Sequence, residues 1–330
     1  MHNEHDQKTS PRVYTRREVI SRVVTTSALM VSTTGLGAFL ASRHSPAGTK
    51  YEEIRDHRTS SSPGSIDMAI ARGPDPGANV RAVINALGGM GRFINKGERV
   101  LIKPNAGWNR LPEQAANTNP EVIAEIIRFV TKAGASEVWV ADVSVNKPER
   151  CFARSGLQKA TQDNGARLIL PDSGGFRLVG LKGQLLREAE VFWPFIKADR
   201  IINVPIVKHH GLTGASMAMK NWYGVLGGHR VRLHQRIDQA ITDLAIMMKP
   251  TLTVLDGTRV MMHNGPSGGS LDDVKRCDTI AAGIDEVALD AFGATLLERS
   301  PDELSFIAVG EKAGLGRSDY KSLKLVETSG

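Results

Sequence analysis

The residues best suited to chemistry gather in one segment, which runs from Lys208 to His234 and reads KHHGLTGASMAMKNWYGVLGGHRVRLH. It holds four basic side chains, four histidines and five glycines, and the glycines let a ligand approach the backbone closely. Cationic groups beside such a backbone suit an anion such as a carboxylate or a phosphate. A basic site of this kind could also stabilise an enolate or oxyanion during proton transfer, with His210 or His234 as the base.

A divalent metal site is the competing interpretation, because the histidines together with Asp142 or Asp256 could ligate an ion. However, His229 and His234 are five residues apart, which is not the spacing that places two ligands on one helix face. In a strand, His209 and His210 would point in opposite directions. Scattered structural histidines remain a third interpretation, and the anion site is the one we favour.

Polar residues also follow several predicted strands, where parallel α/β sheets bind their ligands. Loops are polar in any case, but loop polarity alone does not account for Lys, Asn, His and Asp at several strand ends. We therefore expect these ends to converge on one rim. The candidate catalytic residues are His210, His234, Lys208, Asp142 and Asp256, and the candidate ligand-binding residues are Lys103, Asn105, Lys220, Asn221 and Gly265. In this hypothesis the lysines bind the anion, a histidine transfers protons and an aspartate orients that histidine.

Other motifs are weaker. Residues 265–269 match the letters of G-x-S-x-G, but the predicted strand ends at Asp256, well before Gly265, so a ligand-side loop is favoured over a nucleophile elbow. There is no Walker A sequence and no G-x-G-x-x-G, which leaves the common kinds of nucleotide binding unsupported. Aromatic residues make up 5% of the chain and form no stripe with basic residues, so a nucleic-acid partner is not expected.

Hydrophobic periodicity predicts strands that alternate with amphipathic helices. The predicted strands are 66–71, 99–102, 137–141, 167–170, 200–207, 251–255 and 279–284, and the predicted helices are 77–87, 120–131, 149–164, 235–248 and 286–298. Residues 171–198 are expected to form a hairpin-rich insertion. The alternation predicts an α/β fold with a largely parallel or mixed sheet and helices on both faces. We expect a single globular domain over residues 66–330.

The N-terminal segment is typical of an export signal. Of the formal net charge of +7, residues 1–45 carry six basic and three acidic residues, and the rest carries 36 and 32. Arg16 and Arg17 precede a moderately apolar run over residues 23–40, a layout that resembles a twin-arginine (Tat) signal. An ordinary N-terminal membrane anchor is the alternative. We expect residues 1–45 to engage the Tat export machinery, with retention at the membrane if they stay uncleaved, residues 46–65 to form a flexible linker, and the domain to act in the periplasm or another extracytoplasmic compartment.

Many short motifs, in order over about residues 66–298, resemble the bacterial and archaeal family called domain of unknown function 362. The matching pieces are residues 100–105 (VLIKPN), 119–122 (NPEV), 133–135 (AGA), 202–205 (INVP) leading to Lys208 and His210, 219–221 (MKN) with Gly224, His234, 241–244 (ITDL), 249–257 (KPTLTVLDG), 264–266 (NGP), and 282–283 (AG) with Asp285 and Asp290.

This resemblance implies little chemistry, because the chemistry of the family is largely undefined. Many members carry a ferredoxin-like iron–sulfur segment, whereas this chain has only Cys151 and Cys277, so an iron–sulfur cluster is not expected. The two thiols could pair in an oxidising compartment or be buried singly. Met262 and His263 stand where such proteins often have an acidic residue and Gly, which disfavours a metal site.

The leading hypothesis is an exported α/β enzyme that acts on a small anionic substrate. A non-catalytic periplasmic binding or assembly protein is the alternative from another class, and a metal-dependent oxidoreductase is the third. The cofactor, if any, stays unknown at this stage.

Overall fold

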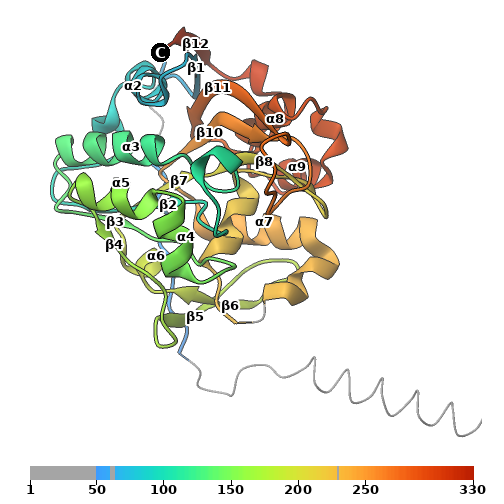
Figure 1. Ribbon diagram of the computed structural model, residues 1–330. Helices are drawn as coiled ribbons and strands as arrows, with labels where there is room; N and C mark the ends of the chain where they lie inside the picture. Colours follow the sequence, from blue (N-terminus) through green and yellow to red (C-terminus); the bar gives the residue numbers. More distant parts are fainter. Residues whose placement is uncertain (1–49, 60–63, 229) are drawn as a thin grey trace, which may run out of the picture. The chain divides into compact units, whose positions relative to one another are not determined.

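The computed structural model describes residues 50–59, 64–228 and 230–330 (Figure 1). Residues 51–330 form one compact unit. The predicted signal segment 1–45, with Arg16, Arg17 and the apolar run 23–40, lies outside the described residues, as do residues 46–49 and 60–63. In the part of the chain that is described, no helix has the length and apolar character needed to cross a membrane.

A mixed sheet forms the centre of the domain and, over the described residues, contains ten strands. Eight of them follow one another across the sheet in the order β12 (Leu325–Ser329), β1 (Met68–Arg72), β11 (Val274–Gly283), β10 (Leu252–Met261), β7 (Arg200–Val204), β2 (Arg99–Pro104), β3 (Glu137–Val140) and β4 (Arg167–Leu168). The remaining two are β8 (Ile206–His210), which pairs with β10, and β9 (Gly214–Ser216), which pairs with β8. The run from β10 to β4 is parallel, whereas β11 is antiparallel to both of its neighbours. The predicted α/β class with a largely parallel or mixed sheet is confirmed.

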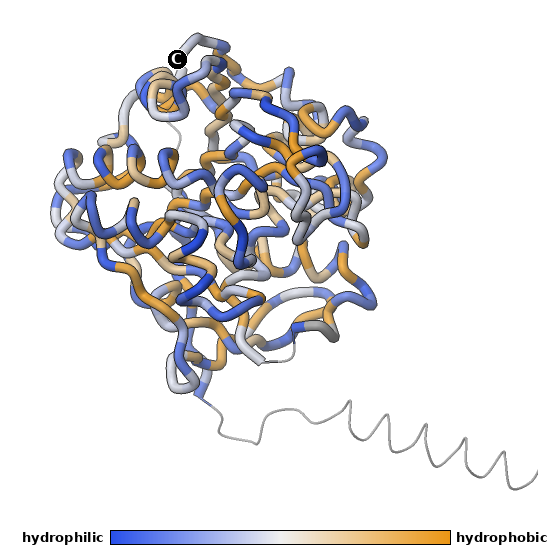
Figure 2. Tube along the Cα trace, in the orientation of Figure 1, coloured by the Kyte–Doolittle hydropathy of each residue, from blue (hydrophilic) through white to orange (hydrophobic). Residues whose placement is uncertain are grey.

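Helices cover both faces of this sheet, as predicted. One face carries α2 (Pro76–Ala86), α3 (Pro120–Lys132), α4 (Pro148–Arg154) and α5 (Leu157–Asp163), and the other carries α6 (Pro194–Lys197), α7 (Ile237–Met248), α8 (Glu286–Leu296) and α9 (Ser305–Lys312). In β2, Leu101 packs into the core cluster on one face, while Val100 and Ile102 pack into the cluster on the other. A strand buried on both faces is apolar at every position, which explains its unbroken hydrophobic run. Figure 2 shows this hydrophobic interior along the central strands.

The insertion between β4 and β7 is a hairpin, which confirms the prediction for residues 171–198. Its strands, β5 (Phe176–Gly180) and β6 (Glu188–Phe192), form a separate two-stranded antiparallel sheet. Residues 51–59 pack near this insertion, although they were predicted to belong to a flexible linker. The Tyr51 hydroxyl donates to Glu188 at 2.7 Å, and Glu52 forms a β-bridge with Val179. His57 is fully buried, so this part of the predicted linker belongs to the folded domain.

Several predicted elements differ from the structure, and the strand predicted over 279–284 begins earlier, at Val274. The helix predicted over 149–164 is two helices, because Gly156 adopts a φ of 76°, which an α-helix cannot contain. The predicted strand 200–207 is two strands, β7 and β8, separated by Pro205, which has no N–H to donate. The strand predicted to end at Asp256 continues to Met261, so Asp256 lies in the middle of β10. Helix α9 and strands β9 and β12 were not predicted.

Candidate functional site

A cavity of about 320 Å³ lies where β2, β3 and β8 end. Parallel pairing of β2 with β3 and with β7 brings the ends of these strands to the same edge of the sheet. Seven of the predicted site residues line this cavity: Asn105, Asp142, Lys208, His210, Lys220, Asn221 and His234. Asn105, Asp142, Lys208 and His210 come from β2, β3 and β8 or the residues directly after them, so these strand ends do converge on one rim. Lys220, Asn221 and His234 reach the cavity from 3-10 helices, and the chemical roles of all seven stay predictions.

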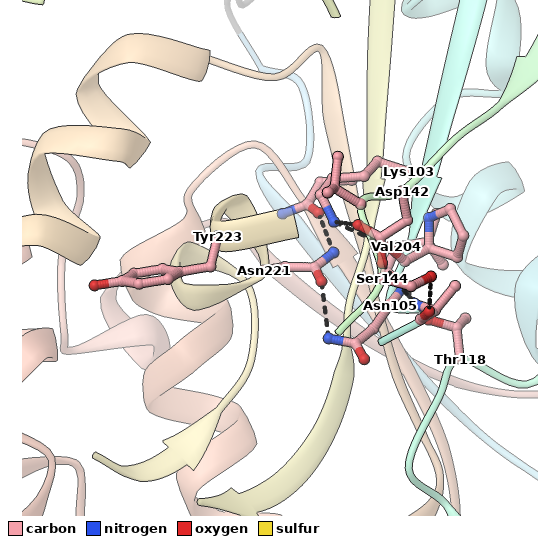
Figure 3. Close-up of polar contacts among 12 residues, drawn as sticks. Lys103, Asn105, Thr118, Asp142, Ser144, Val204, Asn221 and Tyr223 are labelled. Atoms are coloured by element: carbon pink, nitrogen blue, oxygen red, sulfur yellow. Dashed lines mark hydrogen bonds and ion pairs between the residues drawn. The ribbon is translucent and has the colours of Figure 1, made fainter. Parts of the chain in front are cut away.

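Lys103 and Asp142 form a buried ion pair at the base of the cavity. Lys103 Nζ donates to Asp142 Oδ1 at 2.6 Å, and the Ala106 N–H donates to Asp142 Oδ2 at 2.7 Å (Figure 3). Burial lowers the pKa of Lys103, and the attraction of Asp142 opposes that shift. Both carboxylate oxygens are thus engaged by β2 and the loop after it, and not by a histidine of the described residues.

A chain of asparagines connects Lys208 to a buried carboxylate behind the cavity. Lys208 Nζ donates to the Ala116 carbonyl at 2.5 Å and to Asn105 Oδ1 at 3.1 Å. The amide of Asn105 then donates to Asn221, that of Asn221 to Asn203, and that of Asn203 to Glu286, over 3.1, 2.8 and 2.6 Å. Figure 3 shows the first of these amide contacts, between Asn105 and Asn221. Every amide accepts on the lysine side and donates on the glutamate side, so the chain orients Asn105 toward Lys208.

Burial lowers the pKa of Lys208 to about 7, and the positive charge of Lys220 adds to this effect. Behind the cavity, burial raises the pKa of Glu286 to about 7, and the hydrogen bonds from Trp222, Asn203 and Thr253 oppose that shift. The two ends of the asparagine chain therefore both titrate near neutral pH.

Lys220 lies on the 3-10 helix η3 (Met219–Val225), whose start is fixed by Asp290. The carboxylate of Asp290 accepts from the Ala218 and Met219 N–H groups at 2.6 and 3.1 Å. The Lys220 side chain is buried, and its Nζ lies 4.6 Å from the centroid of the Tyr223 ring, a cation–π distance. Burial lowers the pKa of Lys220 to about 8, and Arg230 adds to the shift.

Arg230 is the third cation at the cavity, and it also holds two loops together. Its guanidinium donates to the carbonyls of Val143, Ser144 and Tyr223 at 2.8, 2.8 and 3.2 Å. These bonds join the segment after β3 to η3. Burial lowers the pKa of Arg230, although a guanidinium stays charged in proteins.

His209 and His210 point in opposite directions from β8, as predicted for neighbours in a strand. His210 lines the cavity, whereas His209 on the same strand accepts a hydrogen bond from the Gly265 N–H at 3.1 Å, outside it. The Leu212 N–H donates to His210 Nδ1 at 3.1 Å, which leaves Nε2 as the protonated nitrogen of the neutral ring. Burial lowers the pKa of His210 to about 3, with Lys220 as the next cause, so the ring is neutral at neutral pH and its Nε2–H can donate a hydrogen bond. His234 stacks on Tyr223 with centroids 6.0 Å apart, and burial also lowers its pKa.

Asp256 does not line the cavity, contrary to the predicted role beside a histidine. Its carboxylate is buried in β10 and accepts from the Asn119 N–H at 2.7 Å and from the Thr258 hydroxyl at 2.7 Å. Because the strand continues past Asp256, its side chain holds the start of α3 instead of reaching the rim. Gly265 lies beside the cavity, and its neighbour Pro266 lines it.

Sequence reasoning did not select Trp108, Ser216 or Tyr223, which also line the cavity. Arg230 lines the cavity too, and it belongs to the basic segment from Lys208 to His234. Trp108 follows the Lys103–Asn105 strand end by only three residues, and that proximity was the available indication. Both cysteines are free thiols in this structure, with Cys151 buried and Cys277 half-buried. Across residues 50–59, 64–228 and 230–330, no three His, Cys, Asp or Glu side chains cluster closely enough to hold a metal ion.

The fold and the site define an α/β protein with a cationic cavity at the carboxyl ends of its parallel strands. Residues 100–295 match the family described as Domain of unknown function (DUF362), and the chain belongs to this family. It is also 27% identical over 253 residues to a thylakoid-associated protein of Synechocystis sp., covering 72% of this chain and 75% of that protein.

Two solved structures share a weaker likeness. A protein from Thermotoga maritima has a TM-score of 0.38 at 11% identity, over 73% of this chain and 60% of its own length. The lactate racemase apoprotein from Thermoanaerobacterium thermosaccharolyticum has a TM-score of 0.39 at 14% identity, over 72% of this chain and 57% of its own length. The chain thus spans less than two thirds of either structure.

Proposed function

We propose that this protein is a small-molecule enzyme whose cavity binds an organic anion through a carboxylate or phosphate-like group. The observation that carries the proposal is an imbalance of charge. Lys208, Lys220 and Arg230 line the cavity, while its one lining carboxylate, Asp142, is already paired with Lys103. A buried cation without a counter-ion is costly, and a bound anion would supply the missing charge.

The walls of the cavity support an organic ligand over a bare inorganic ion. Trp108, Val143, Val145, Leu212 and Pro266 line it together with the cations. An apolar wall with a few convergent polar groups is the usual composition of a small-molecule site. A catalytic role is favoured over simple binding because two of the cavity amines titrate near neutral pH, where proton transfer and nucleophilic attack are accessible.

Isothermal titration calorimetry with sodium propionate and with inorganic phosphate tests the anion site. We expect at least one probe to bind the wild-type protein, and we expect Lys220→Met to weaken that binding about tenfold or more, or ~1.4 kcal/mol. Lys312→Met, an exposed lysine on α9, is the matched control and should bind like the wild type. A folded wild type that binds neither probe, or equal affinities for wild type and Lys220→Met, would contradict the proposal.

We further propose that residues 1–45 direct export through the twin-arginine route. The order of a polar segment, Arg16-Arg17 and a moderately apolar run supports this proposal. The Synechocystis relative is described as thylakoid-associated, which is compatible with work at a membrane. Fusing residues 1–50 to a reporter tests it: export should be lost when Arg16 and Arg17 are both replaced by Lys, and unchanged export of that variant would rule it out.

A further inference from the structure

The three lysines at the cavity differ in what holds their ammonium groups. Lys103 is paired with Asp142, and Lys208 donates to two fixed acceptors. Lys220 has neither a hydrogen-bond acceptor nor an ion-pair partner among the residues that the structure describes, and its Nζ contacts the face of the Tyr223 ring. Lys220 as a whole is only 6% exposed, and it lines the cavity.

The surroundings of Lys220 make its neutral amine more accessible than that of an exposed lysine, because burial lowers its pKa to about 8. Arg230 is the cation that most lowers its pKa, and Asp238 at the start of α7 opposes the effect. Lys208, His210 and His234 also feel the charge of Lys220, so three further basic groups surround it. A buried primary amine with a lowered pKa is the form in which lysine attacks carbonyl carbon.

If Lys220 attacks the carbonyl carbon of a ligand, the other donors of the cavity are suited to bind a carboxylate of that ligand. Lys208 has three N–H donors, and two of them are used by Ala116 and Asn105, which leaves one for a ligand. His210 contributes a protonated Nε2, since its Nδ1 accepts from Leu212. A carboxylate next to a carbonyl would be able to use all of these groups.

We propose that Lys220 forms an imine with the carbonyl carbon of a 2-oxo acid, and this inference rests on the proposed anion site. Nζ attacks the carbonyl carbon to give a carbinolamine, which then loses its oxygen as water. The C=O bond is replaced by C=N, both amine hydrogens leave with the water, and no oxidant or reductant is required. His234 stacks on the same Tyr223 ring that Lys220 covers, and it carries the proton from the attacking nitrogen to the departing hydroxyl.

Reductive trapping tests the imine. The full-length protein is incubated with sodium pyruvate and sodium cyanoborohydride, and the modified lysine is mapped by peptide mass spectrometry. We expect a 1-carboxyethyl group on Lys220 and about tenfold less of it on any other lysine, because only a neutral amine adds to a carbonyl. Excess propionate, which has the carboxylate but no carbonyl, should suppress the labelling.

Lys220→Arg is the matched variant because it keeps the positive charge but has no amine that forms an imine. It should still bind propionate and should lose the labelling, with thermal unfolding used to confirm that it is folded. Propionate binding by the wild type without label on Lys220 overturns the imine and leaves the anion site standing. Failure of the folded wild type to bind propionate, phosphate or pyruvate overturns both proposals.

Discussion

The buried carboxylates behind the cavity and the buried cations that line it differ in the partners that the protein gives them. Glu286 accepts hydrogen bonds from Trp222, Asn203 and Thr253, and Asp290 accepts from two backbone N–H groups of the η3 start. Asp243 on α7 likewise accepts from the backbone N–H groups of residues 184–186. At the cavity, by contrast, Lys220 contacts the face of the Tyr223 ring and has no acceptor among the described residues, and Lys208 has two acceptors among them for its three donors.

This difference distinguishes buried charges that stabilise the fold from buried charges that are available to a ligand. A buried charge that the chain satisfies with its own groups fixes the segments that supply those groups, and its loss destabilises the fold. A buried charge that the chain leaves partly unsatisfied costs stability in the free protein, and a ligand of opposite charge can recover that cost. The carboxylates therefore hold η3 and its neighbours in place, and the cations are the groups that we propose bind a ligand.

The largest effect is expected at Asp290. Replacing it by Ala leaves the buried Ala218 and Met219 N–H groups without acceptors, at a cost of about 4 kcal/mol in the free energy of unfolding. Chemical denaturation measures this loss, and Asp290→Asn should lose less because its amide oxygen still accepts one bond. A loss for Asp290→Ala no larger than that for Lys220→Met would break the distinction between the two regions.

The pH dependence of stability should have opposite signs at the two ends of the asparagine chain. Glu286 has its pKa raised from 4.5 to about 7, so the folded state holds the extra proton and stability falls as pH rises through that window. Lys208 has its pKa lowered from 10.5 to about 7, so the unfolded state holds the extra proton and stability rises above pH 7. Each slope is at most about 1.4 kcal/mol per pH unit.

Denaturation at about pH 5, 7 and 9 separates these contributions. Relative to Glu286→Gln, the wild type should lose stability over the lower interval. Relative to Lys208→Met, it should gain stability over the upper interval. If the free energy of unfolding of each variant changes with pH as that of the wild type does in both intervals, neither group changes its pKa on folding.

A methyl group added at Gly224 should disturb the ion pair between Asp142 and Lys103. Its Cβ would lie 2.0 Å from Asp142 Oδ1 and 2.7 Å from Lys103 Nζ, so the ion pair must move. We expect Gly224→Ala to lower the free energy of unfolding by about 2 kcal/mol. Gly91→Ala is the control, since no atom lies within 4 Å of its added Cβ. Similar losses in both variants would argue against strain at the pair.

The smallest effect is expected from Asn105→Ala, which breaks the asparagine chain at Lys208. Lys208 loses one of its two acceptors and Asn221 loses a donor, for about 1 kcal/mol of stability. Losing an acceptor also disfavours the ammonium form, so the pH at which stability begins to rise should move lower. Asn85→Ala on the exposed side of α2 is the comparison; because Ala favours a helix more than Asn does, it should not lower the stability, and it should not move that pH.

Much of the fold and part of the site could be predicted from the sequence. The β2 and α3 segments carry strong hydrophobic periodicity, and their observed bounds differ from the prediction by two residues or fewer. Lys103 lies near the end of β2 and Asp142 follows the parallel strand β3, which explains why they meet. The prediction for Asp256 was wrong because β10 continues beyond its parallel neighbours and pairs with the antiparallel strand β11. Nothing in the sequence around Asp256 indicates that the neighbouring strands end there while β10 does not.

The sequence by itself therefore determined the alternation of strands and helices and the basic character of the segment from Lys208 to His234. It also indicated that polar residues gather at the edge where the parallel strands end. Only the tertiary structure decided which charges are paired. Asp142 forms an ion pair with Lys103, and Asp290 accepts hydrogen bonds from the start of η3. Lys220 contacts the face of the Tyr223 ring. The physical reason is that a residue type sets what a group can bond to, whereas pairing and burial depend on distances between segments far apart in the chain.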